Sequence, residues 1–72
     1  MTERARYVFV VKEFEGGQPW ICLESQDKQI GILKNGLLGF DLAEGISLSQ
    51  AKAIAKNLNT TIKKISYTDL TA

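Results

Sequence analysis

The stretch from Gly45 to Asn59 constrains the fold most, because it carries both a start signal and a stop signal for an α-helix. Ser47 is placed to act as the N-cap. Gln50, three residues later, completes a capping box in which each side chain binds the backbone N–H of the other residue. Asn59 can adopt the left-handed conformation that ends many helices. We therefore expect a helix that begins after Ser47 and ends at Asn59, with an apolar face formed by Leu48, Ala51, Ala55 and Leu58.

The residues before this helix favour strands and turns. The segment from Arg6 to Phe14 is rich in β-branched and aromatic residues, which suit a packed strand. The adjacent glycines at positions 16 and 17 tolerate the positive φ angles of a tight hairpin turn. Pro19 lacks an amide donor and belongs at the start of the next strand, which we expect to cover Trp20 to Glu24. The sequence therefore predicts an N-terminal β-hairpin.

The region from 30 to 42 has two interpretations. In the first, residues 30–33 form a short strand, Asn35 and Gly36 form a hairpin turn, and residues 37–42 form the return strand. In the second, the region is one bent strand. Gly39 indicates a bulge or a close backbone approach in either case. After the helix, residues 60–67 have the pattern of a final strand.

Together these elements predict a single α+β domain over residues 1–72. It has a small, mainly antiparallel sheet of three or four strands and one helix packed on one face, in the order β-β-β-α-β. If the helix forms a right-handed crossover, the last strand lies beside the first. A core of this size supplies only about 3–5 kcal/mol of stability by itself, so the domain needs very close packing or a partner.

The residue content disfavours several kinds of functional site. Histidine is absent, which removes the commonest general base and metal ligand, and Cys22 is the only cysteine, so no intrachain disulfide can form. The glycines follow no phosphate-binding spacing, and Asp41 and Glu44 fit the acidic approach to a helix. We therefore expect no enzyme, no catalytic residue, no cofactor and no metal site. The free thiol favours a cytoplasmic location, and the short apolar runs predict no membrane partner.

The hairpin predicts an interaction surface if Gly16 and Gly17 are its two turn residues. In that register Val11 lies opposite Cys22, and both faces of the hairpin are apolar. Because one helix covers only one face, the aromatic face stays open and mediates self-association or docking of another protein, with Trp20 as its anchor. The predicted contact residues are Tyr7, Phe9, Val11 and Trp20, with Glu13 and Glu24 at the rim.

Three alternatives work against this open face. A strongly coiled sheet can bury both faces of its central strand. The segment from 30 to 42 can fold beneath the sheet and cover the aromatic side chains. A longer loop between Phe14 and Pro19 shifts the hairpin register and redistributes the side chains between the faces.

Nucleic-acid binding is a second hypothesis, from a different functional class. Aromatic side chains on a sheet can stack on bases while nearby lysines contact phosphates. The formal net charge of +1 gives this hypothesis little support, and the predicted register places Glu13 and Glu24 on the aromatic face. The lysines that would contact phosphates are Lys52, Lys56, Lys63 and Lys64.

Overall fold

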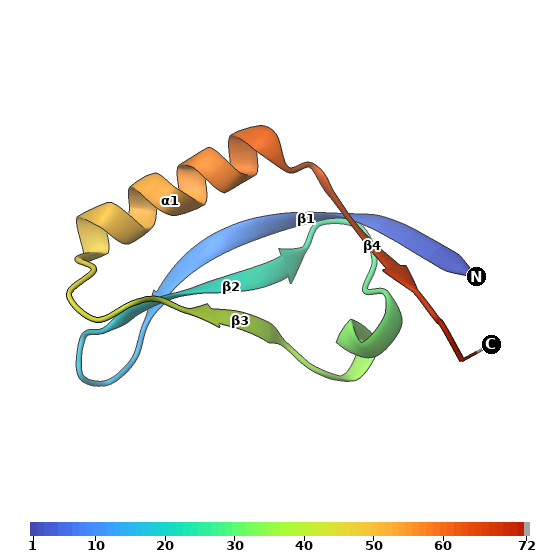
Figure 1. Cartoon of the computed structure of the whole chain (residues 1–72), viewed down its shortest axis with the longest axis horizontal. Coiled ribbons are helices and arrows are strands. Elements are labelled where there is room, and N and C mark those ends of the chain that lie inside the picture. The colour runs from blue at the N-terminus through green and yellow to red at the C-terminus, as the bar shows by residue number, and fades with distance from the viewer. Residues whose placement is uncertain (72) are drawn as a thin grey trace.

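A computed structural model describes residues 1–71 and consists of one antiparallel sheet and one long helix (Figure 1). The four strands lie in the order β3-β2-β1-β4, and β1 pairs antiparallel with both β2 and β4. The predicted α+β class, the order β-β-β-α-β and the place of the last strand beside the first are confirmed. The elements are β1 (Thr2–Glu13), β2 (Pro19–Ser25), a 3-10 helix η1 (Gly31–Asn35), β3 (Leu38–Asp41), α1 (Leu48–Thr61) and β4 (Lys64–Thr68).

The loop between β1 and β2 has three residues, Glu15 to Gly17, and not the two that the sequence suggested. The N–H of Phe14 donates to the C=O of Gln18 at 2.9 Å, and the N–H of Gly17 donates to the C=O of Phe14 at 2.8 Å. Gly17 has a φ of 82°, which is the left-handed position that follows the turn in a three-residue hairpin loop. The predicted register is therefore wrong by one residue, and Val11 pairs with Ile21.

The start of α1 is as predicted. The Ser47 side chain accepts a hydrogen bond from the N–H of Gln50 at 3.1 Å, and the Gln50 side chain accepts one from the N–H of Ser47 at 2.8 Å. The predicted end at Asn59 is wrong, because the helix continues to Thr61. The final strand begins correspondingly later, at Lys64.

Asn59 lies inside the helix, and its side chain binds β1. Its Oδ1 accepts from the backbone N–H of Phe9 at 2.7 Å, and its Nδ2 donates to the backbone C=O of Phe9 at 2.9 Å. β4 pairs with β1 only from Thr2 to Arg6, so Phe9 lies beyond the end of that ladder. The amide of Asn59 thus replaces a strand partner and fixes α1 to β1, because a half-buried backbone group requires a hydrogen bond.

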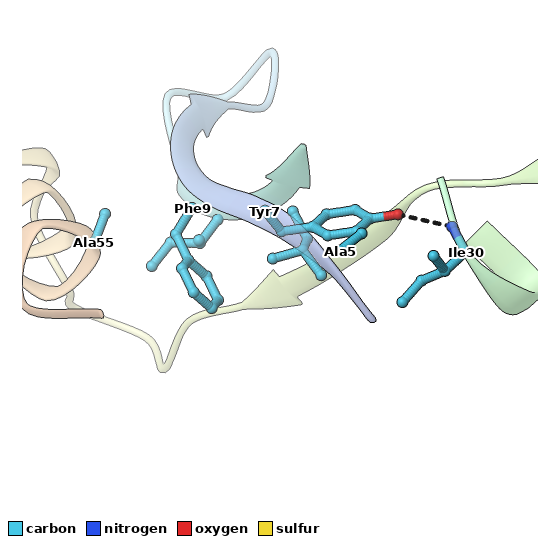
Figure 2. Packing of buried hydrophobic residues seen from close by; sticks show 7 residues of the cluster. Ala5, Tyr7, Phe9, Ile30 and Ala55 are labelled. Carbon is cyan, nitrogen blue, oxygen red and sulfur yellow. Dashed lines mark hydrogen bonds between the residues drawn. The ribbon is translucent and has the colours of Figure 1, made fainter. Parts of the chain in front are cut away.

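The predicted strand at 30–33 and the turn at Asn35 are wrong, because this segment forms η1 after an extended residue. Ile30 is fully buried, and its N–H donates to the hydroxyl oxygen of Tyr7 at 3.1 Å (Figure 2). The N–H of Gly31 donates to the Glu3 carboxylate at 3.0 Å, and this hydrogen bond holds the pKa of that carboxyl below its usual value. These N–H groups bind side chains, so they are not donors to a strand ladder.

The core lies between the sheet and α1, which packs on β1 and β2. Figure 2 shows Ala5, Tyr7 and Phe9 along β1, with Ala55 of α1 near one end of the row and Ile30 near the other. Ile65 and Tyr67 of β4 pack against the same cluster. The buried members are Ala5, Tyr7, Phe9, Ile21, Leu23, Ile30 and Ala55.

The bridge from Asn59 to Phe9 gives the first prediction. Replacing Asn59 with Ala leaves the N–H and C=O of Phe9 without these partners, and we expect the free energy of unfolding to fall by about 1–3 kcal/mol. The matched control is Asn57→Ala, an exposed position on the same helix with the same change in helix propensity. Chemical denaturation of both variants measures the difference, and equal stability of the two would contradict the role assigned to Asn59.

Candidate interaction surface

The three aromatic side chains that were predicted to form one surface lie on two different faces. In the observed register Phe9 is opposite Leu23, and Lys12 is opposite Trp20. Because opposed residues share a face and successive residues alternate, Trp20 is on the face opposite to Phe9. The structure therefore does not bring the predicted contact residues together.

Tyr7 and Phe9 lie on the helix side and are almost completely buried. The Phe9 ring contacts the Phe40 ring of β3, with the ring centroids 6.0 Å apart. Val11 is half-buried against the same cluster. These three residues belong to the interior of the subunit and leave little surface for a partner.

Trp20 covers part of the opposite face of the sheet, which we call the open face because α1 lies on the other side. Its six-membered ring lies against the backbone of Gly39, where an added Cβ would meet Cζ3 at 2.8 Å. Phe14 stacks on the indole with centroids 5.4 Å apart and planes 14° apart. A close approach at Gly39 was predicted, and its cause is an aromatic ring that fills the space of the missing side chain.

An ion pair crosses the open face near Trp20. Lys12 Nζ lies 3.0 Å from Glu24 Oε2, and the pair spans the strand positions of Val10 and Cys22. The hydrogen bond and charge of Glu24 raise the pKa of Lys12 above its ordinary value. Cys22 is only 1% exposed although no helix lies over it. The open face is thus covered in part by its own side chains, while Glu13 is exposed at the end of β1.

The largest uncovered apolar strand is β3, at one edge of the sheet. Figure 1 shows α1 lying over the β1 side, with β3 at the edge farther from the helix. Leu38 and Phe40 face the helix side but are 40% and 41% exposed, and the preceding Leu37 is 75% exposed. We call these three residues the β3 edge patch. The apolar run from 37 to 40 was visible in the sequence, but its place at an edge depends on the strand order.

The backbone of β3 has a free side. Phe9 uses its N–H and C=O on Asn59, so the pair of Phe9 and Leu23 is not hydrogen-bonded across the hairpin. In an antiparallel ladder, a residue that does not bond across one side directs its N–H and C=O toward the strand on its other side. Leu23 therefore directs its backbone N–H and C=O toward Leu38 of β3. By the same alternation, Gly39 and Asp41 direct their N–H and C=O groups away from β2, along the outer edge of the sheet.

The four lysines of the nucleic-acid hypothesis do not share one surface. Lys52 and Lys56 are exposed on α1, which lies on the helix side. Lys64 pairs with Arg6, whose position along β1 places both on the open face. Lys63 is exposed in the connection between α1 and β4. In the observed register Lys12 and Arg6 lie on the same face as Trp20, unlike in the predicted register. Both form ion pairs, Lys12 with Glu24 and Arg6 with Asp27.

No concentration of reactive groups was found in the described part of the chain. Residues 1–71 contain no group of three or more His, Cys, Asp or Glu side chains that could hold a metal ion. Asp41 lines a hollow of about 140 Å³ beside Phe14 and Ile46, and this hollow is small for an organic ligand. Within the same residues, no helix has the length and apolar character needed to cross a membrane.

No protein-family model matches the chain, and neither a curated protein nor a solved structure gives a significant match. The proposed function therefore rests on the geometry of this chain alone.

The cover over Cys22 gives the second prediction. Trp20→Ala uncovers Gly39 and the neighbouring part of the open face, and we expect the Cys22 thiol to react with an aromatic disulfide reagent on the order of tenfold faster under native conditions. The control is Leu58→Ala, which weakens packing on the helix side. If both variants accelerate the reaction equally, the thiol is exposed by general unfolding and Trp20 is not its cover.

Proposed function

We propose that this chain is a non-catalytic protein-interaction module that self-associates through the β3 edge patch. The observation that carries the proposal is the combination of exposed apolar side chains and free backbone groups on one edge strand. An edge of this kind is a template for pairing with another chain, and proteins usually protect it with charged residues, proline or a covering element. From Leu37 to Phe40, β3 and its approach contain neither lysine nor proline.

The other edge of the sheet supports this choice by contrast. β4 begins with Lys64 and follows Lys63, so its start carries the charges that oppose edge pairing. β3 has a single charge, that of Asp41 at its end. The contact surface therefore differs from the aromatic face predicted from the sequence, whereas self-association remains the proposed activity.

The area available suggests a reversible association. Standard stable interfaces bury about 800 Å² on each partner, and one short strand with three apolar side chains offers less. We therefore expect a dissociation constant of about 1–100 μM, since affinity depends on a few well-buried anchors. The absence of histidine supports a non-catalytic role, and the free thiol of Cys22 fits a reducing compartment such as the cytoplasm.

Sedimentation velocity over a concentration series tests this proposal. The wild-type chain of 8.0 kDa should show a mass that rises toward twice that value, whereas Leu38→Lys should stay monomeric because a charge at this edge opposes pairing. The control is Ile54→Lys on α1, since Ile54 is 37% exposed and Leu38 is 40% exposed. A wild-type chain that remains monomeric at millimolar concentration would refute the proposal, as would equal loss of association in both variants.

A further inference from the structure

We infer that the partner is a second copy whose β3 pairs antiparallel with β3 about a two-fold axis at Phe40, giving one continuous sheet. This inference rests on the proposed self-association. A two-fold axis perpendicular to the sheet makes the edge strands antiparallel and keeps both helices on the same side. Opposed residues then share a face, so Leu38 and Phe40 must lie opposite helix-side residues of the partner.

The backbone of β3 is already arranged for this pairing. Gly39 and Asp41 direct their N–H and C=O groups outward, as the alternation from Phe9 through Leu23 requires. With Phe40 on the axis, Gly39 lies opposite the partner's Asp41, and the two residues exchange both backbone hydrogen bonds. Phe40 and the partner's Phe40 then form a non-hydrogen-bonded pair, the type in which opposed side chains are closest.

The side chains favour this register over its neighbours. With Phe40 on the axis, Leu38 faces the partner's Leu42, so each helix-side pair is apolar and the two Asp41 side chains are not opposed. Moving the axis to Gly39 pairs Leu38 with the partner's Phe40, which gives two apolar helix-side pairs in place of three, and it places Leu37 opposite the partner's Asp41. Moving the axis to Leu38 places Phe40 opposite the partner's Gly36 and leaves one apolar helix-side pair. Both shifts therefore leave fewer apolar pairs on the helix side than the axis at Phe40 does.

The pairing also continues the core of each subunit. Phe40 contacts Phe9, whose ring is buried beneath α1. Adding the partner's Phe40 extends this contact into a row of aromatic rings that crosses the sheet, and aromatic pairs across strands stabilise a sheet. Contact with the partner's Phe40 and Leu42 would cover part of the area that Phe40 and Leu38 now expose.

Disulfide trapping tests the register. Opposed Cβ atoms in such a pair lie about 4.5–5.5 Å apart, close to disulfide range, so Phe40→Cys should form a disulfide-linked dimer under mild oxidation. Leu38→Cys alone should not, because the two copies of residue 38 lie about 13 Å apart along the strands. A mixture of Leu38→Cys and Leu42→Cys keeps Phe40 intact and should form a linked heterodimer. The wild type, with Cys22 buried, is the control for unrelated oxidation.

Sedimentation of the same samples before oxidation separates the two proposals. Linked dimers of Phe40→Cys and of the mixture, at roughly tenfold the yield of Leu38→Cys alone, would support the inferred axis. An associating mixture that forms no linked heterodimer overturns the register and leaves self-association intact. Linkage of Leu38→Cys alone would move the axis to Leu38 and also overturn it. If the wild type does not associate at all, both the proposed function and this inference fail.

Discussion

The register of β1 against β2 is the constraint on which the other contacts depend. The three-residue loop, closed between Phe14 and Gln18, sets which residues of the two strands share a face. Gly17 makes this loop possible, because a left-handed residue is required after the turn. A shift of one residue would bring Trp20 to the face of Tyr7 and Phe9 and would remove Ile21 from the core.

Two tertiary contacts build on that register. With Phe9 on the helix side, its ring packs against Phe40 while its backbone binds Asn59, so β1 is joined to β3 and α1 at one residue. Within residues 1–71 the opposite face carries no helix, and Trp20 over Gly39 and the pair of Lys12 with Glu24 reduce its exposed area. β3 is left partly uncovered, because α1 lies over β1 and β2.

The sequence was informative where a structural signal is local. The capping box of Ser47 and Gln50 needs only neighbouring residues, and the strand propensity of β1 and β2 is a property of each segment. The fold class follows from the order of these elements. The errors arose where a distant residue decides the outcome: Asn59 binds Phe9 and does not end the helix, and η1 forms where Tyr7 and Glu3 bind backbone N–H groups. The single aromatic face expected from the sequence does not form, because adjacent glycines permit hairpin loops of two or three residues and the three-residue loop places Trp20 on the face opposite to Tyr7 and Phe9.

The hairpin register determines both the core and the exposed surface, and cross-strand contacts between Hα atoms in nuclear Overhauser spectra measure it directly. Hα atoms are closest in non-hydrogen-bonded antiparallel pairs, so the structure predicts strong contacts between Phe9 and Leu23 and between Val11 and Ile21. A two-residue loop would place Val10 opposite Leu23 and Val11 opposite Cys22. Strong Hα contacts within either of those pairs, with none between Phe9 and Leu23, would contradict the account of the core and of the surface derived from it.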